Sequence, residues 1–518
     1  MMRPVSALFA VLLILGTFHL PPYIVNAEHW FPFVAAASAI RHGDWPLFGG
    51  FDSGYGLLCP AFLALWLAGF GVSKLSLSAL VMLSNVIAGS ASFVLIRGLT
   101  SSPLLALIGA LYPLQGIDEM TALNARTFAV SSTFRAPVQI AIGALLLDLC
   151  LRDRRGRIWP AFLFGVTTLW NPAFGAFAAV GFLAAQGYRM LHATGNERVV
   201  VVRIVLAMLA GAAIPLALIA ALGRSAAPGD WYGITVARIE LDLLGYANQA
   251  QQFDPIVTAA FIAGALYLAL LLRRISRGRV LTTKYLFVGA SVVAALPYGV
   301  YALARSDPTH YLPAYWCLIP TLALFASGFF RLFSMRSTLA APLRAIRRSR
   351  TDAAATIVLA LAVGALWWGS FPFERVLAPT QLAASYQHFE RPGARAAGAA
   401  PVDVDPRLIA ACRAGLPVLS YSDAWIYALG DCYSPLRLPS VSFLTRRSQV
   451  ERTSRELAAR DTIVLDQTRN AYADWRGSML DDIRQQLVRQ GFAEASGCGR
   501  FSVLSRAGTT SVLRKLCP

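Results

Sequence analysis

The chain has 518 residues, of which 56% are hydrophobic and only 14% are charged, and its formal net charge is +18. Soluble proteins normally carry about 25% charged residues, so this chain has too little polar surface to cover its apolar segments in water. A basic excess can indicate a nucleic-acid partner, but here the arginines stand in short blocks between long apolar runs. This distribution is typical of the cytoplasmic loops of membrane proteins and argues against nucleic acid. The composition predicts an α-helical polytopic membrane protein.

Long apolar runs occupy the first three-quarters of the chain, and a helix of about 20 apolar residues crosses the hydrocarbon of a bilayer. We read about 11 of them as transmembrane helices: Val5–Ile24, Leu77–Ile96, Pro103–Gly116, Pro137–Leu151, Ile158–Trp170, Ala173–Tyr188, Val199–Leu222, Pro255–Leu272, Tyr285–Ala304, Tyr311–Phe330 and Ala353–Phe371. The first run is alternatively a cleaved signal peptide, because Val25-Asn26-Ala27 resembles a cleavage site. An odd number of spans puts the two termini on opposite sides.

The arginine blocks fix the predicted orientation, because basic loops remain in the cytoplasm. Three blocks follow apolar runs, at 152–157, 273–284 and 331–350. All three fall on one side if the apolar segment Leu57–Phe70 does not cross the membrane. We therefore expect this segment to lie at the outer interface. We therefore expect a multi-pass protein of the inner (cytoplasmic) membrane, with a cytoplasmic N-terminus and a periplasmic or external C-terminal domain.

The predicted topology gives a transmembrane domain over residues 1–371, with external loops at 25–56, 117–136, 223–254 and 305–310. A linker over 372–406 follows, and its last part is rich in Ala, Gly and Pro. Residues 407–518 alternate short apolar runs with helical patterns, which predicts an exported α/β domain. The expected strands are Leu416–Tyr421, Thr462–Asp466 and Phe501–Ser505. The expected helices are Ser448–Arg460 and Trp475–Gln490.

The seven cysteines divide into two groups. Cys59, Cys150 and Cys317 lie in or beside apolar segments, which favours core packing. Four more cysteines fall in the C-terminal domain, and an exported domain with four cysteines permits two disulfides in three possible pairings. They are Cys412, Cys432, Cys498 and Cys517.

Glu28 is the first acidic residue of the chain and follows the first apolar run by a few residues. A carboxylate at a lipid–water boundary is partly desolvated, which raises its pKa and suits a general base. The alternative is that Glu28 caps the amphipathic segment Phe31–Arg41 that follows.

Two later loops also carry charged residues beside apolar runs. Asp118 and Glu119 are followed by Arg126 and Arg135, a set that suits a phosphate or metal site or a solvated loop. The charged residues of the 305–310 loop lie close to the hydrocarbon, where an unpaired charge is costly. They either have a functional role or form a surface pair between Arg305 and Asp307. Asn171-Pro172 predicts a tight turn.

In the C-terminal domain, Asp423, Trp425 and Tyr427 suit a sugar contact, whereas Trp425 alone is better explained as a core residue.

The order of these stretches resembles the GT-C superfamily of integral membrane glycosyltransferases. An acid follows the first span, then come Gly43-Asp44-Trp45-Pro46 and Tyr55-Gly56-Leu57-Leu58, similar to the family's "G-x-x-P … Y-G-P-L". Arg305-Ser306-Asp307-Pro308-Thr309-His310 resembles a recurrent "R-x-D-x-x-H" element of bacterial members. The resemblance covers roughly residues 1–371 and implies a GT-C-like fold.

Members of this superfamily transfer sugar from a polyprenyl-phosphate carrier at the external face of the membrane. The resemblance implies a hexosyl- or pentosyltransferase in which Glu28 is the general base and Asp118 or Glu119 orients the acceptor or a metal. It also implies a donor phosphate site and a site for the sugar and for a glycan, lipid or protein acceptor. Candidates for the phosphate are Arg126, Arg135, Arg305 and His310, and those for sugar or acceptor are His29, Asp44, Asp52, Tyr55 and Asp307.

Two other functions stay open. One is a transporter or flippase for a lipid-linked substrate, although no internal repeat of the kind found in transporters is evident. The other is a non-catalytic scaffold, because His29 follows Glu28 where many relatives carry a second acid. A divalent metal is an open cofactor, and the sequence names neither sugar nor acceptor.

Overall fold

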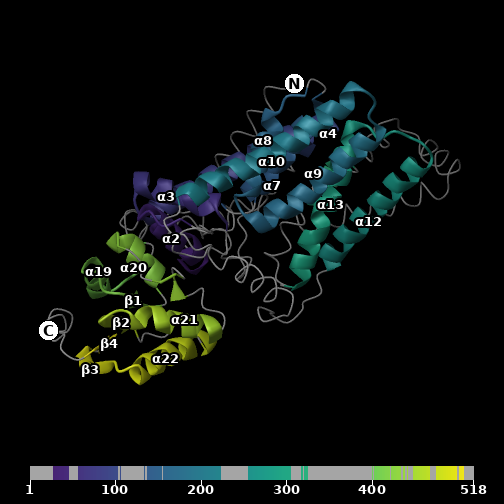
Figure 1. The fold of residues 1–518 in the computed structure, drawn as a ribbon. Coiled ribbons are helices and arrows are strands. Elements are labelled where there is room, and N and C mark those ends of the chain that lie inside the picture. The colour runs from purple at the N-terminus through teal and green to yellow at the C-terminus, as the bar shows by residue number, and fades with distance from the viewer. Residues whose placement is uncertain are drawn as a thin grey trace, which may run out of the picture. The chain divides into compact units, whose positions relative to one another are not determined.

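The computed structural model describes residues 27–45, 56–102, 105–106, 134, 137–153, 156–222 and 255–304, a few positions between 317 and 324, and most of 400–466 and 474–506. The chain forms two compact units. Unit 1 comprises Met1–Pro22, Ser78–Pro215 and Ile239–Ala394, and unit 2 comprises Tyr23–Leu77, Leu216–Arg238 and Arg395–Pro518. Figure 1 shows the elements of both.

The described part of unit 1 consists of helices and the turns that join them. They are α4 (Lys74–Thr100, beginning in unit 2), α7 (Pro137–Arg152), α8 (Trp159–Thr168), α9 (Pro172–His192), α10 (Asn196–Leu222, ending in unit 2), α12 (Pro255–Ser276) and α13 (Thr283–Ala304). Prolines stand in the first turns of α8 and α9, where no intrahelical N–H is lost. Asn171-Pro172 lies in the tight turn between them, as the sequence predicts.

The apolar runs predicted these helices to within a few residues. The predicted span Pro137–Leu151 is α7, and Tyr285–Ala304 lies within α13. At ten residues, α8 covers roughly 15 Å, about half the hydrocarbon thickness. The predicted spans that lie wholly or largely outside the described residues are Val5–Ile24, Pro103–Gly116, Tyr311–Phe330 and Ala353–Phe371. The total number of spans therefore stays a prediction.

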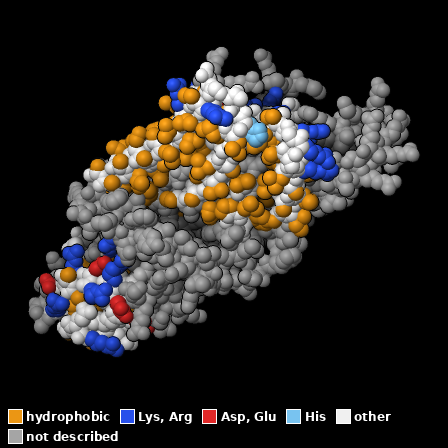
Figure 2. Space-filling view, turned by 45° about the vertical axis from the view of Figure 1, so that its right-hand side comes forward, with side chains coloured by type: hydrophobic (Ala, Val, Ile, Leu, Met, Phe, Trp, Pro, Cys, Tyr) orange, Lys and Arg blue, Asp and Glu red, His pale blue; other side chains and the backbone are white. Residues whose placement is uncertain are grey.

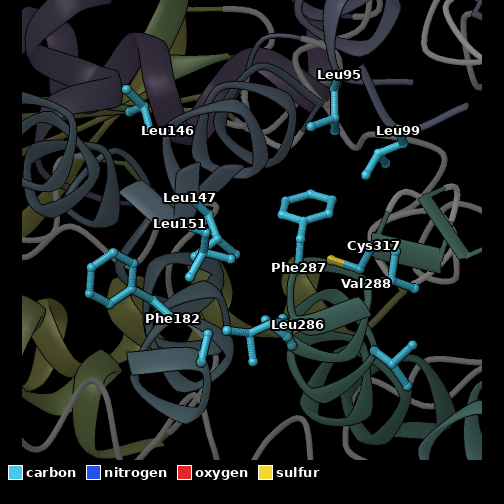
Figure 3. Close-up of a cluster of buried hydrophobic side chains, with 14 of the residues drawn as sticks. Leu95, Leu99, Leu146, Leu147, Leu151, Phe182, Leu286, Phe287, Val288 and Cys317 are labelled. Atoms are coloured by element: carbon cyan, nitrogen blue, oxygen red, sulfur yellow. The ribbon is translucent and has the colours of Figure 1, made fainter. Parts of the chain in front are cut away.

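The core of unit 1 is an apolar cluster between the helices (Figure 3). Phe287 on α13 is fully buried and lies among leucines from α4 and α7. Phe164 and Phe182 stack with ring centroids 4.6 Å apart, and the Tyr298 hydroxyl donates to the Phe174 carbonyl at 3.0 Å. Cys150 and Cys317 are buried here without a disulfide, and Cys59 is buried in unit 2 without a disulfide, which confirms the prediction of core packing.

Large apolar side chains also cover the outside of unit 1. They include Val94 on α4, Leu183 on α9 and Leu206 on α10, each about half exposed. Figure 2 shows a broad hydrophobic area over the helices of this unit, with lysine and arginine side chains along its upper and right-hand edges. Among the described residues, two helices are long and apolar enough to cross a membrane, Lys74–Thr100 and Asn196–Ala221. Such a surface fits lipid better than water.

Charged side chains of unit 1 gather at one end of its helices, which we call the basic end. Lys284 Nζ donates to the Leu99 carbonyl oxygen at 2.9 Å, and Arg189 Nη1 donates to the Cys150 carbonyl oxygen at 3.2 Å. The Arg274 guanidinium lies 4.5 Å from the centre of the Tyr285 ring. The Leu281 N–H also donates to the Tyr188 hydroxyl at 2.8 Å, so these contacts together join the C-terminal ends of α4, α7, α9 and α12 and the N-terminal end of α13. The described residues of the first two predicted arginine blocks therefore lie at the same end of the unit, and the side of the membrane that this end faces stays a prediction.

Residues 400–506 of unit 2 form a four-stranded sheet between two pairs of helices. Its strands are β1 (Val418–Leu419), β2 (Thr462–Asp466), β3 (Ala493–Cys498) and β4 (Phe501–Ser505), in the order β1-β2-β4-β3. β1 pairs with β2 in parallel, and the other two pairings are antiparallel. The helices are α19 (Pro406–Arg413), α20 (Asp423–Gly430), α21 (Arg447–Ala458) and α22 (Asp474–Arg489).

Alternate strand residues build a core on each face of this sheet. Ile463, Leu465 and Leu504 pack with α21 and α22, whereas Val464 and Val503 pack with α19 and α20. The sequence predicted β2 and β4 residue for residue and both of the longer helices, but it missed β3, α19 and α20. β3 is an edge strand of sequence Ala-Glu-Ala-Ser-Gly-Cys, which has no apolar alternation to reveal it.

Two helices from the N-terminal part of the chain belong to unit 2. They are α2 (Ala27–Arg41) and α3 (Leu58–Phe70), which pack together, and α2 also packs against α20. The segment Phe31–Arg41 was predicted to be amphipathic, and this is wrong for its described side chains. Residues 33–40 are all buried, because α3 and α20 cover them on different sides.

Candidate functional site

Glu28 is the second residue of α2 as the structure describes it, Ala27–Arg41, and His29 follows it. Four alanines after Pro32 favour the helix, whereas Pro32 itself removes one backbone N–H donor. The residues before Ala27 lie outside the described part of the chain, so the capping role stays a prediction beside the catalytic one. The side chains of Glu28 and His29 lie outside the described residues.

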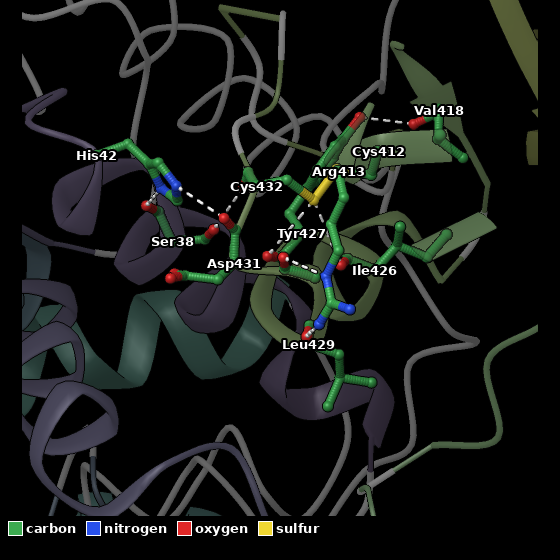
Figure 4. The surroundings of a disulfide bond; sticks show 11 residues. Ser38, His42, Cys412, Arg413, Val418, Ile426, Tyr427, Leu429, Asp431 and Cys432 are labelled. Atoms are coloured by element: carbon green, nitrogen blue, oxygen red, sulfur yellow. Dashed lines mark hydrogen bonds between the residues drawn. A yellow bond between two sulfur atoms is a disulfide. The ribbon is translucent and has the colours of Figure 1, made fainter. Parts of the chain in front are cut away.

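The C-terminal end of α2 is held by contacts with the C-terminal residues of unit 2 (Figure 4). Arg41 Nη2 lies 2.9 Å from Asp431 Oδ1, and the Ser38 hydroxyl donates to the Cys432 carbonyl oxygen at 3.4 Å. The ring nitrogens of His42 lie 2.9 Å from the Ser38 carbonyl oxygen and 3.3 Å from that of Asp431. Asp44, a predicted sugar-binding residue, is partly exposed just beyond this end.

A polar cluster lies at the end of unit 1 opposite the basic end, and we call it the Gln139 cluster: Gln139, Thr167, Trp170 and Asn171. Gln139 Nε2 donates to the carbonyl oxygens of Thr167 at 2.8 Å and Asn171 at 3.1 Å. Trp170 Nε1 donates to the Phe134 carbonyl oxygen at 3.2 Å. Gln139 is buried, and its Oε1 has no hydrogen-bond partner among the described residues.

Two helix ends of unit 1 meet at the Gln139 cluster. The N-terminal end of α7 carries Gln139, and Arg135 precedes this helix by two residues. The C-terminal part of α13 reaches the start of α9 through the Tyr298–Phe174 hydrogen bond, and Arg305 directly follows α13. The helix ends next to both arginines therefore lie at the same end of unit 1.

Most of the predicted site residues themselves lie outside the described part of the chain. They are Asp52, Tyr55, Asp118, Glu119, Arg126, Arg135, Arg305, Asp307 and His310. Their roles stay predictions. Sequence reasoning missed Gln139, although a lone amide inside a predicted transmembrane run is a signal for a functional or packing role. Among the described residues, no group of three His, Cys, Asp or Glu side chains has the arrangement of a metal site.

Asp423 in the C-terminal residues is a structural carboxyl group and not a sugar ligand. It is fully buried and accepts hydrogen bonds from the Ser440 hydroxyl at 2.5 Å, from the Val441 N–H at 2.6 Å and from the Ala424 N–H at 2.7 Å. Burial raises its pKa to about 7, against the opposing effect of these hydrogen bonds. Trp425 and Tyr427 are buried as well, so the alternative of a sugar contact is wrong and the core role of Trp425 is confirmed.

A disulfide joins Cys412 at the end of α19 to Cys432, just beyond α20. It selects one pairing of the three that the four cysteines of this domain allow. Disulfides persist in oxidising compartments and are rare in the cytosol.

Comparison with known proteins gives structural similarity without sequence similarity. No protein-family model matches the chain, and no curated protein matches it. A crystal structure of ArnT from Cupriavidus metallidurans bound to undecaprenyl phosphate is similar over 98% of this chain and 99% of that one, with 13% identity and a TM-score of 0.47. The oligosaccharyltransferase AglB from the archaeon Archaeoglobus fulgidus, in complex with an inhibitory peptide and a dolichol-phosphate, is similar over 97% of this chain and 74% of that one, with 13% identity and a TM-score of 0.45.

Proposed function

We propose that this protein is a membrane glycosyltransferase of the GT-C type, which takes a sugar from a polyprenyl-phosphate carrier at the external face of the membrane. Undecaprenyl phosphate and dolichol phosphate, the lipids bound in the two similar structures, belong to the class of carrier that we assign. The observation that carries the proposal is the meeting of the helix ends beside Arg135 and Arg305 at the Gln139 cluster, opposite the basic end.

The proposed chemistry is a single displacement at the anomeric carbon. Glu28 takes the proton of the acceptor hydroxyl, whose oxygen forms the new glycosidic bond while the bond to the carrier phosphate breaks. The leaving group is a phosphate anion, so a cation such as Arg135 or Arg305 stabilises the charge that develops. One such donor lowers the barrier by on the order of 3 kcal/mol. A single displacement inverts the anomeric configuration.

Two observations support an external site. The described residues of the first two arginine blocks lie at one end of unit 1, which suits the cytoplasmic side and supports an outward-facing site at the opposite end. The Cys412–Cys432 disulfide suits a domain outside the cytosol. The carrier tail stays in lipid in this arrangement, and its phosphate reaches the headgroup level, where the charged loops are predicted.

The proposal is tested with purified full-length protein in lipid nanodiscs. The donors are polyprenyl-phosphate hexoses and pentoses, and the readout is polyprenyl phosphate released in the presence of glycan or glycolipid acceptors. We expect Glu28→Gln to lower kcat by about 100-fold or more, since the variant lacks the general base. Glu451→Gln, which makes the same change on α21, should leave the rate unchanged.

Full activity in Glu28→Gln removes this residue from the mechanism. Movement of a lipid-linked sugar across vesicles without covalent change would instead support a flippase. Donor binding without turnover in the unaltered protein would support a scaffold, the reading favoured by His29 in place of a second acid.

A further inference from the structure

The turn after α20 is built to receive the C-terminal end of α2. We call residues 430–432 the receiving turn. Asp431 has φ 49° and ψ 48°, a left-handed conformation that Asp and Asn tolerate better than most other residues. Gly430 leaves no room for a side chain, since a β-carbon there would lie 2.6 Å from Cys432 Sγ.

Two further interactions hold this turn against α19. The disulfide ties Cys432 to Cys412, the penultimate residue of α19. Arg413 Nε donates to the Gly430 carbonyl oxygen at 3.1 Å, and its Nη2 donates to that of Leu429 at 3.4 Å. The receiving turn is therefore fixed by its own domain before any contact with α2 is counted.

The receiving turn contacts three side chains, two from α2 and one from the residue that follows α2. Ser38 and His42 contact Cys432 and Asp431 (Figure 4). Arg41 pairs with Asp431, and the residues of these pairs are nearly 400 positions apart in the chain. The apolar side chains of α2 between Phe33 and Ile40 are buried, so α2 moves as part of this unit. Arg41 and Glu28 lie 13 residues apart in α2, with Pro32 between them, so a displacement at Arg41 shifts the helix that carries Glu28.

We infer that the C-terminal domain positions the proposed catalytic helix, with Asp431 as a positioning residue that acts through Arg41 on α2 and thereby on Glu28. This inference rests on the proposed function for Glu28. It assigns the domain a role in the reaction besides any acceptor binding. A positioning residue of this kind changes the rate of the bound complex and leaves substrate affinity nearly unchanged.

The experiment compares charge variants of the pair in full-length protein in nanodiscs. Hydrogen exchange of residues 27–45 is measured beside kcat and KM for the donor. Asp431→Lys faces Arg41 with a like charge, and we expect exchange in α2 to rise and kcat to fall, each by about five- to tenfold, with KM unchanged. The exchanged-charge double variant Arg41→Glu with Asp431→Lys should restore most of both.

Two further variants separate positioning from a damaged turn. Asp431→Asn keeps a side chain that tolerates the left-handed conformation and removes only the charge, so a smaller effect of about threefold is expected. Asp481→Lys makes the same charge change as Asp431→Lys on exposed α22 and should alter neither readout. Exchange in β2 and β4 reports whether the domain remains folded.

Unchanged exchange in α2 of folded Asp431→Lys would overturn the inference, and so would loosened α2 with full kcat. If the unaltered protein transfers no sugar, the proposed function fails and the catalytic part of the inference fails with it. The exchange data still decide whether Asp431 holds α2.

Discussion

Asp423 shows how burial changes the chemistry of a single carboxyl group. It has no exposure to solvent and receives three hydrogen bonds, two of them from backbone N–H groups. Its pKa is raised to about 7, while a free aspartate has a pKa near 3.8. Between these two values the folded state binds more protons than the unfolded state, so the contribution of Asp423 to stability falls as the pH rises from about 4 to 7.

This gives a pH-dependent prediction for Asp423→Asn, which cannot titrate. The melting temperature of the unaltered protein minus that of the variant should shrink steadily as the pH rises from 4.5 to 7.5. The difference in unfolding free energy between the two proteins should change by at most about 1.4 kcal/mol per pH unit. Scanning fluorimetry at several pH values measures it, with exposed Asp481→Asn as control. A difference that is independent of pH would show that the carboxyl group titrates normally.

At the scale of elements, glycines set how closely the helices of unit 1 approach. A β-carbon at Gly165 on α8 would overlap the carbonyl oxygen of Met208 on α10. A β-carbon at Gly211 on α10 would in turn overlap the carbonyl oxygen of Phe162 on α8. Reciprocal small residues of this kind allow close backbone packing in a helix pair that has no hydrophobic driving force in lipid.

Gly165→Ala and Gly211→Ala should each destabilise the protein by about 3 kcal/mol, because the two backbones must separate. Gly187→Ala on α9 is the matched control, since nothing lies within 4 Å of a β-carbon there, and it should be neutral or stabilising. The melting temperature in detergent and the monodisperse fraction measure the effect. Equal melting temperatures for all three variants would contradict this packing.

Helix α3 has the form of an interfacial helix. It is 13 residues long, or roughly 20 Å, which is too short to cross about 30 Å of hydrocarbon. One face, with Leu63 and Leu67, is buried, whereas Phe62 and Leu65 on the other face are 38% and 74% exposed. An apolar exposed face on a short helix suits the boundary of headgroups and acyl chains.

Cysteines introduced on either side of α3, at the partly exposed positions Asp44 and Val72, should therefore both react with an impermeant thiol reagent added from outside. The unaltered protein controls for the native cysteines. Labelling of one position only from the outside and of the other only after the membrane is opened would show that α3 crosses. The predicted orientation of every later span would then reverse.

At the scale of the whole molecule, the disulfide and the exported location predict each other. Peptide mapping without reductant should link the peptides that contain Cys412 and Cys432, and any second bridge in the domain then joins Cys498 to Cys517. Replacing Cys412 and Cys432 together by serine should cost about 3 kcal/mol of stability, the value for a loop closed over 20 residues. Recovery of both cysteines as free thiols from membranes would contradict an oxidising location.

The sequence by itself determined where the helices and most strands form. Long apolar runs predict α4, α7, α9, α10, α12 and α13 because a helix satisfies its own backbone hydrogen bonds locally. Short runs that contain Ile, Val, Leu or Phe predict β2 and β4 in the same way. Edge strand β3 and the eight-residue helices α19 and α20 were missed, because their apolar patterns are too short or absent.

Only the tertiary structure decided which distant residues meet. The pairing of Cys412 with Cys432, the burial of Asp423 and the contact of Arg41 with Asp431 depend on how elements pack, and no local pattern encodes them. The local sequence does not distinguish a charged residue that binds a sugar from one that accepts buried hydrogen bonds. Packing settles the difference, because burial and partners set the energy of the charge.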